Sequence, residues 1–159
     1  MKALFKRAAM GGTFHLIHKG HEELFKEAFY LADLVVVGLS SDDLVRKLGK
    51  RHPVASFKDR LRVVGEFLVK KGWLRRCLLF KLDDRYGPTI NDPEIDLIVV
   101  SEETLDVAFM INYMRKKKGY PPLSIAVIKT VLADDGKPIS TTRIIAGEID
   151  KEGRLLKIA

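Results

Sequence analysis

The feature that most restricts the fold is the alternation of continuous apolar runs with amphipathic stretches. Residues 34–40 read LVVVGLS, a run rich in β-branched side chains without polar alternation, which is typical of a strand buried on both faces. Further strands are expected in four other apolar runs, at residues 4–10, 75–82, 96–101 and 123–132. Because helical stretches separate the runs, we predict an α/β fold: a doubly wound sheet of about five parallel strands with helices on both faces.

The stretches between the expected strands have helical spacing and capping residues. Helices are predicted over residues 19–32, 40–48, 56–70 and 102–118, with a short one in ISTTRIIAG at 139–147. In the fourth of these, the apolar stripe formed by Leu105, Phe109 and Tyr113 is predicted to face the core. The C-terminal residues 148–159 have no clear pattern. In such a Rossmann-like sheet, the loops that follow the strands meet in one crevice, where ligands bind.

The length of 159 residues predicts a single domain, residues 1–159. No apolar run approaches the ~18 residues of a membrane span, and the single cysteine, Cys77, suits a reducing compartment, so we expect a cytoplasmic protein with no membrane partner. The net charge of +7 favours anionic partners, either phosphorylated small molecules or nucleic acid. Because the basic residues are dispersed and form no zinc-finger, RNP or basic-zipper signature, nucleic acid is not an expected partner. The absence of Gln and the abundance of Lys, Arg and Glu are typical of thermophile proteins.

Residues 11–21, GGTFHLIHKGH, concentrate three glycines and three of the four histidines. One interpretation is a metal site, but His15, His18 and His21 could bind one ion together only from a loop, and no Cys, Asp or Glu in the segment adds a ligand. A second is a phosphate site, in which the two leading glycines let a ligand approach the backbone and the free N–H groups of the following helix favour an anion. The third is an ordinary strand-to-helix turn with solvent-facing histidines.

Two motifs far apart in the chain resemble the signatures of one enzyme superfamily. GGTF followed by HKGH resembles the first signature of the nucleotidylyltransferases, a T/HxGH motif, and residues 139–144, ISTTRI, resemble the second, an ISSTxIR-like segment that opens a helix. The segments LDDRYGPT (residues 82–89), DLIVVSEET and VLADDGKPIS are similar to the archaeal and eukaryotic type of phosphopantetheine adenylyltransferase. The resemblance covers nearly the whole chain. It has one departure: the family usually has an acidic residue after GGTF, where this chain has His15, so the role of position 15 is left open.

The resemblance implies transfer of AMP from ATP to 4′-phosphopantetheine, which gives dephospho-coenzyme A and pyrophosphate. The attacking phosphate is already anionic, so no general base is required, and the protein has to position two polyanions and neutralise charge at the α-phosphate. Mg²⁺ is expected to arrive with ATP and not in a metal site built by the protein. Another nucleotidylyltransferase is the alternative: a cytidylyltransferase, or an adenylyltransferase for nicotinamide mononucleotide or flavin mononucleotide. Whether the chain is a monomer or a homo-oligomer is left open.

The resemblance also implies roles for individual residues. His18 and His21 would act in catalysis by donating hydrogen bonds to the α-phosphate, and Lys50 would bridge the phosphates from a basic loop in which Lys47 and Arg51 are alternatives. The residues expected to bind ATP are Gly11, Gly12, Thr13, Phe14, His21, Ser101, Ser140, Thr141, Thr142 and Arg143. Those expected to bind the acceptor are Thr13, Lys50, Asp83 and Tyr86. Simpler interpretations are a solvated basic loop at KLGKR, a plain helix cap in ISTTRI and an ordinary turn in LDDRYGPT.

Overall fold

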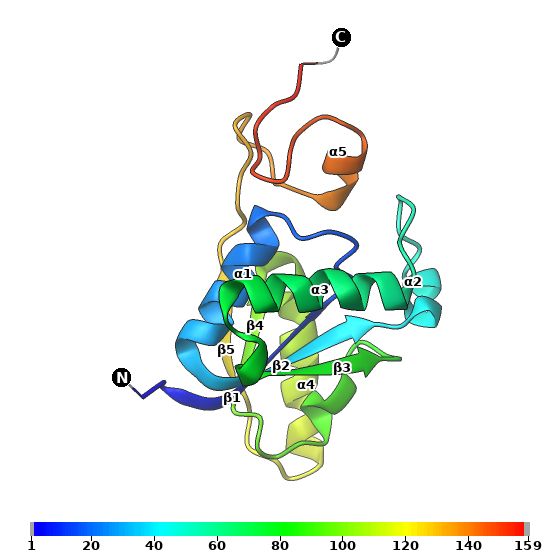
Figure 1. Ribbon diagram of the computed structural model, residues 1–159. Coiled ribbons are helices and arrows are strands. Elements are labelled where there is room, and N and C mark those ends of the chain that lie inside the picture. The colour runs from blue at the N-terminus through cyan, green and yellow to red at the C-terminus, as the bar shows by residue number, and fades with distance from the viewer. Residues whose placement is uncertain (1, 158–159) are drawn as a thin grey trace.

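The computed structural model describes residues 2–157, with five parallel strands in one sheet at the centre (Figure 1). The strands are β1 Phe5–Gly12, β2 Ala32–Ser40, β3 Cys77–Leu82, β4 Leu97–Ser101 and β5 Ser124–Ile128, and their order in the sheet is β3-β2-β1-β4-β5. Because β1 pairs with both β2 and β4, the chain winds outward from β1 to β3 and then crosses back to β4. This order confirms the predicted doubly wound, Rossmann-like sheet, whose strand order reverses between β1 and β4.

Five α-helices and three 3-10 turns lie between or after the strands within residues 2–157. They are α1 Lys19–Leu31, α2 Asp42–Leu48, α3 Phe57–Lys71, η1 Leu74–Arg76, η2 Gly87–Ile90, η3 Glu102–Thr104, α4 Leu105–Lys117 and α5 Thr141–Ile145. The hydroxyls of Ser41, Ser56 and Ser140 begin α2, α3 and α5 by accepting hydrogen bonds from the backbone N–H three residues on. Gly49 and Gly72 end α2 and α3 with φ values of 61° and 75°. No helix within residues 2–157 combines the length and apolar character needed to cross a membrane.

Helices cover both faces of the sheet, and alternate residues of β1 point to opposite sides. Ala8 and Met10 pack in the larger hydrophobic cluster, together with buried residues of α1 and α3. Ala9 packs in a second cluster with Ala108 and Ile111 of α4. The continuous apolar runs therefore reflect burial of the central strands on both faces, as predicted.

The predicted core face of α4 is wrong. Phe109 and Tyr113 are 61% and 56% exposed, and of the predicted stripe Leu105 alone packs against the second cluster. The helix instead buries Ile111 and Arg115. The guanidinium of Arg115 donates hydrogen bonds to four backbone carbonyl oxygens of the neighbouring loops. These bonds, which the apolar pattern could not predict, fix the rotation of α4 about its axis.

The residues after β5 form a small lobe beyond the end of the sheet (Figure 1). The predicted strand over 123–132 ends at Ile128, and the following chain makes two isolated bridges and the short α5. The buried residues of this lobe are Ala133, Ile139 and Ile149. The backbone N–H of Lys19 donates to the carbonyl oxygen of Lys151 at 2.9 Å. The lobe therefore contacts the first residue of α1.

Candidate active site

Two adjoining cavities open where the loops follow the strands. The first, which we call the motif pocket, has a volume of about 470 Å³ and is lined by residues 11–15, 49–52 and 138–142. The second, the apolar pocket, has a volume of about 320 Å³ and extends along the sheet toward α4. The residues that line both are Gly11, Gly12, Thr13, Leu24, Leu48, Lys50 and Thr104. The two sequence motifs, separated by about 120 residues, thus meet in one cavity.

The loop after β1 turns at Phe14, which has a φ of 53°. This left-handed conformation strains a residue with a side chain by roughly 1–3 kcal/mol. The ring is buried and folds back over Gly12, where a Cβ atom would lie 2.9 Å from the Cζ atom of Phe14. Its centroid lies 5.2 Å from that of the His21 ring in an edge arrangement. Phe14, predicted to bind ATP, therefore lines the motif pocket from the core side and supports His21.

The imidazoles of His18 and His21 cap the start of α1. Nδ1 of His18 accepts hydrogen bonds from the backbone N–H groups of Gly20 at 3.0 Å and His21 at 3.3 Å, and Nδ1 of His21 accepts from the N–H of His18 at 3.2 Å. The two rings stack with their centroids 3.7 Å apart. A neutral imidazole that accepts at Nδ1 carries its proton on Nε2. Each histidine can therefore offer one Nε2–H donor to the motif pocket.

The backbone N–H groups at this helix start are not free, so that detail of the prediction is wrong. The N–H of Lys19 donates to Lys151, and the next two donate to Nδ1 of His18. Because an imidazole caps the helix, an anion here would meet histidine Nε2–H groups and not peptide N–H groups. The helix dipole still favours negative charge at this end.

Both motif histidines are uncharged near neutral pH. Burial lowers the pKa of His18 from 6.5 to about 4. Burial, and then the charges of His18 and Lys50, lower the pKa of His21 to about 3. Their neutral state agrees with the capping bonds, because a protonated Nδ1 cannot accept. Positive charge in the motif pocket therefore comes from lysine and arginine.

The loop over residues 49–56 contributes basic residues to both cavities. Lys50 lines both pockets, Arg51 lines the motif pocket, and Lys47, on α2, lines neither. The structure thus separates three residues that the sequence left as alternatives. Lys50 alone of the three lies where a cation can reach ligands in both cavities.

The second motif contributes hydroxyl groups, and its arginine points elsewhere. Ser140 accepts a hydrogen bond from the N–H of Arg143 at 3.2 Å, and residues 140–142 line the motif pocket. Arg143, predicted to bind ATP, lines neither pocket. Its Nη2 lies 2.5 Å from Oδ2 of Asp135 and its Nε lies 2.8 Å from Oε2 of Glu148. Its charge is therefore neutralised within the C-terminal lobe.

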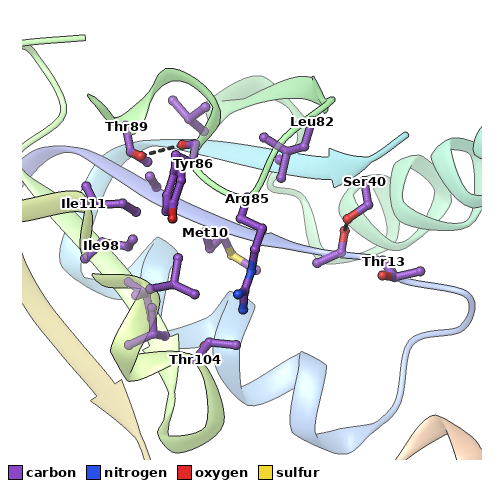
Figure 2. A pocket seen from close by; sticks show the side chains of 18 of the residues that line it. Met10, Thr13, Ser40, Leu82, Arg85, Tyr86, Thr89, Ile98, Thr104 and Ile111 are labelled. Carbon is purple, nitrogen blue, oxygen red and sulfur yellow. Dashed lines mark hydrogen bonds between the residues drawn. The ribbon is translucent and has the colours of Figure 1, made fainter. Parts of the chain in front are cut away.

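The apolar pocket lies against α4, and Figure 2 shows Arg85 reaching into it toward Thr104. Tyr86 also lines this pocket, whereas Asp83, predicted to bind the acceptor, is exposed and lines neither cavity. Asp84 shapes the loop instead. Its Oδ1 accepts hydrogen bonds from the backbone N–H groups of Tyr86 and Gly87, both at 2.8 Å. Apolar walls with two cations, Lys50 and Arg85, suit a ligand that has a neutral arm and an anionic group.

Ser101, the remaining residue predicted to bind ATP, ends β4 and lines the motif pocket. Its Oγ lies 3.3 Å from Oγ1 of Thr104. No group of three or more His, Cys, Asp or Glu side chains within residues 2–157 is arranged to hold a metal ion.

The Nδ1 atom of His15 accepts a hydrogen bond from the N–H of Ala55 at 2.8 Å. All three histidines of the first motif thus use Nδ1 for a backbone contact.

The comparisons with known proteins agree with this geometry. A family model described as cytidylyltransferase-like matches residues 9–147. A relative from Methanopyrus kandleri named phosphopantetheine adenylyltransferase is 46% identical over 149 residues, which cover 94% of each chain. A relative of the same name from Methanosarcina mazei is 44% identical over 156 residues, which cover 96% of this chain and 99% of the relative. The chain belongs to the cytidylyltransferase-like family and, within it, to the phosphopantetheine adenylyltransferases. A solved structure from Archaeoglobus fulgidus, described as a protein with unknown function, has a TM-score of 0.69 at 30% identity and covers 78% of this chain and 89% of its own.

Sequence reasoning missed several pocket residues of this phosphopantetheine adenylyltransferase family member, among them two that line the apolar pocket. Arg85 and Thr104 line the apolar pocket, and Thr104 also lines the motif pocket. Arg85 stands in LDDRYGPT between two residues that were considered, Asp83 and Tyr86. The available signal was its position in a loop that follows a parallel strand, where charged side chains gather at the crevice.

Proposed function

We propose that this chain transfers AMP from ATP to 4′-phosphopantetheine, producing dephospho-coenzyme A and pyrophosphate. An oxygen of the acceptor phosphate forms a bond to the α-phosphorus of ATP, and the bond from that phosphorus to the oxygen bridging the β-phosphate breaks. No proton has to leave the attacking oxygen. The proposal depends on one observation: both motifs line a single cavity, which shares Lys50 with a second cavity beside it.

The motif pocket is the proposed ATP site. The Nε2–H groups of His18 and His21 donate to the α-phosphate, where negative charge grows as the pyrophosphate departs. Hydroxyl groups of residues 140–142 bind the β- and γ-phosphates from the C-terminal lobe. This assignment is supported by the neutral, Nδ1-accepting state of both histidines, which leaves each Nε2–H as a donor.

The apolar pocket is the proposed site of the pantetheine arm. The acceptor phosphate lies at the wall shared by the two cavities, where Thr13 orients it and Lys50 contacts both phosphates. The neutral arm extends past Arg85 and Tyr86 toward α4. Thr13 and Lys50 line both cavities, and Arg85 and Tyr86 line the apolar pocket, which supports this arrangement.

Mg²⁺ is proposed to arrive on the phosphate oxygens of ATP. Glu103 is the carboxylate that lines the motif pocket among the described residues, and one carboxylate is too few for a protein cage. It suits an ion that keeps several waters and binds mainly to substrate phosphates. When bound, the ion would neutralise phosphate charge in a pocket whose other cations are Lys50, Arg51 and Lys129.

The test is an activity assay with a matrix of substrates. The purified chain is incubated with ATP or CTP and with 4′-phosphopantetheine, nicotinamide mononucleotide, flavin mononucleotide or a polyol phosphate, while pyrophosphate release and product mass are measured. We expect pyrophosphate and dephospho-coenzyme A from ATP with 4′-phosphopantetheine. Faster turnover with CTP, or with another acceptor, would overturn the proposal.

A further inference from the structure

A fully buried arginine outside the two motifs connects three segments around the motif pocket. Arg60, in the first turn of α3, has an exposed fraction of 0%. Its Nε donates to the carbonyl oxygen of Ala55 at 2.8 Å, its Nη1 to that of Thr13 at 2.8 Å, and its Nη2 to Oδ1 of Asp42 at 3.0 Å. The guanidinium thus ties the first motif to α2 and to the end of the Lys50 loop.

The same loop is held from the other side by His15. Nδ1 of His15 accepts a hydrogen bond from the backbone N–H of Ala55 at 2.8 Å. Ala55 is therefore fixed at both polar groups, since its N–H contacts His15 and its carbonyl oxygen contacts Arg60. Both contacts lead to the first motif, because Arg60 also holds Thr13.

We propose that His15 is a positioning residue that, in its neutral form, fastens the loop over residues 49–56 to the first motif and so holds Lys50 at the boundary of the two pockets. This inference depends on the proposed function, in which Lys50 contacts both phosphates. It also accounts for the departure at position 15 from the acidic residue usual in the family. Nδ1 of histidine and Oδ1 of aspartate or asparagine are each bonded to Cγ, so all three side chains present an acceptor at the same distance from the backbone.

Histidine differs from an acidic residue in how protonation affects the hydrogen bond from the Ala55 N–H. Two basic side chains act on His15: the ring of His52, whose centroid lies 5.7 Å from that of His15, and the buried guanidinium of Arg60 on α3, whose charge disfavours a proton on the imidazole. The nearby carboxylate of Asp42 is already bonded to Arg60 and to the N–H of Phe57. Burial, followed by His52 and Arg60, lowers the pKa of His15 from its ordinary value. Neutral His15 accepts from Ala55, whereas a proton on Nδ1 abolishes the contact and adds charge beside Arg60.

The test compares two variants that differ in one acceptor. His15→Asn keeps an acceptor on Cγ that does not titrate, and His15→Leu has a similar branch without an acceptor. We expect His15→Asn to retain kcat within about twofold near neutral pH and His15→Leu to lose about tenfold, with smaller changes in KM. As pH falls and His15 takes up a proton, the ratio of His15→Asn to wild-type rates should rise and then level off at about tenfold, the loss expected for His15→Leu. Because both enzymes act on the same substrates, titration of the substrate phosphates affects both rates equally and cancels in this ratio.

Two further measurements separate positioning from general stability. In a Lys50→Ala background, His15→Leu should cost little additional turnover, because the residue that it positions is absent. The Ala55 amide should be protected from hydrogen exchange in wild type and His15→Asn, and should exchange faster in His15→Leu.

Parallel pH profiles of wild type and His15→Asn, or an undiminished effect of His15→Leu without Lys50, would overturn the inference. Absence of wild-type turnover with every acceptor would instead refute the proposed function. Exchange at Ala55 would still test the contact in that case.

Discussion

The two motifs that share the motif pocket are supported very differently. The first lies on the main core, where Phe14, Leu24 and Phe25 are buried, and its histidines are fixed by capping bonds and stacking. The second lies on a lobe with a three-residue buried cluster and a five-residue helix. Segments with few buried apolar contacts open at lower free energy. From this difference we expect the first motif to position the groups around the reacting phosphorus and the second to bind the pyrophosphate end of ATP. Substitutions in the first should then lower kcat, and those in the second should raise KM for ATP.

The largest expected effect is on turnover, from losing the Nε2–H donor of His18. His18→Asn can still cap α1 through an acceptor on Cγ but has no such donor, so we expect kcat to fall about 10²- to 10³-fold at near-normal stability. His18→Gln places an amide near the Nε2 position without the capping acceptor, and should retain more turnover while losing about 1 kcal/mol of stability. Steady-state kinetics and thermal unfolding measure both. Near-normal turnover of the asparagine variant would remove His18 from the reaction.

The second expected effect is a loss of stability in acid that originates in the first motif. The unfolded chain binds protons at its histidines below their ordinary pKa of 6.5, whereas folded His18 and His21 bind them near pKa values of about 4 and about 3. The free energy of unfolding should therefore fall as pH falls from 6.5 toward 4, by about 3 kcal/mol from His18 alone. Denaturant titrations across this range measure it. His18→Asn is the control and should show a shallower dependence, so an unchanged slope would contradict the assignment.

A third test concerns the cation between the pockets. Lys50→Ala should lower kcat roughly 10- to 100-fold, the range expected for losing charge-assisted hydrogen bonds to phosphate. Lys47→Ala removes the same charge from α2, away from both cavities, and should stay within about twofold of wild type. Equal losses in the two variants would show that the basic loop acts through net charge and not through one positioned residue.

The smallest expected effects belong to the second motif. Ser140→Ala combined with Thr142→Ala should raise KM for ATP about tenfold, because two neutral hydrogen bonds are lost, and should leave kcat nearly unchanged. Arg143→Ala is the matched control, since that side chain is paired with Asp135 and Glu148 and lines neither pocket. It should lower the unfolding temperature slightly without changing KM for ATP. A fall in kcat with constant KM in the double variant would mean that both motifs act at the reacting phosphorus.

The sequence was sufficient to predict the sheet and the meeting of the two motifs, because both follow from short-range patterns. Continuous apolar runs separated by helices specify buried parallel strands, and such strands bring their following loops to one edge of the sheet. Ser140 and Gly49, at the ends of α5 and α2, are equally local signals.

The features that escaped prediction depend on contacts between distant segments. The rotation of α4 follows from hydrogen bonds of Arg115 to loops around residues 89–95 and 121, which no helical period encodes. Arg143 lines neither pocket, because Asp135 and Glu148 lie beside its guanidinium in the folded chain and pair with it. The capping of α1 by imidazoles could not be distinguished from a free helix start, since histidine is not a usual capping residue.

The left-handed turn at Phe14 limits how far this protein could be stabilised by design. Glycine there would relieve roughly 1–3 kcal/mol of backbone strain. It would also remove the ring that packs over Gly12 and beside His21. Because loss of a buried aromatic ring costs about 3–5 kcal/mol, more than the strain relieved, glycine at this position should lower the free energy of unfolding as well as turnover. Folding and catalysis therefore favour the same strained phenylalanine.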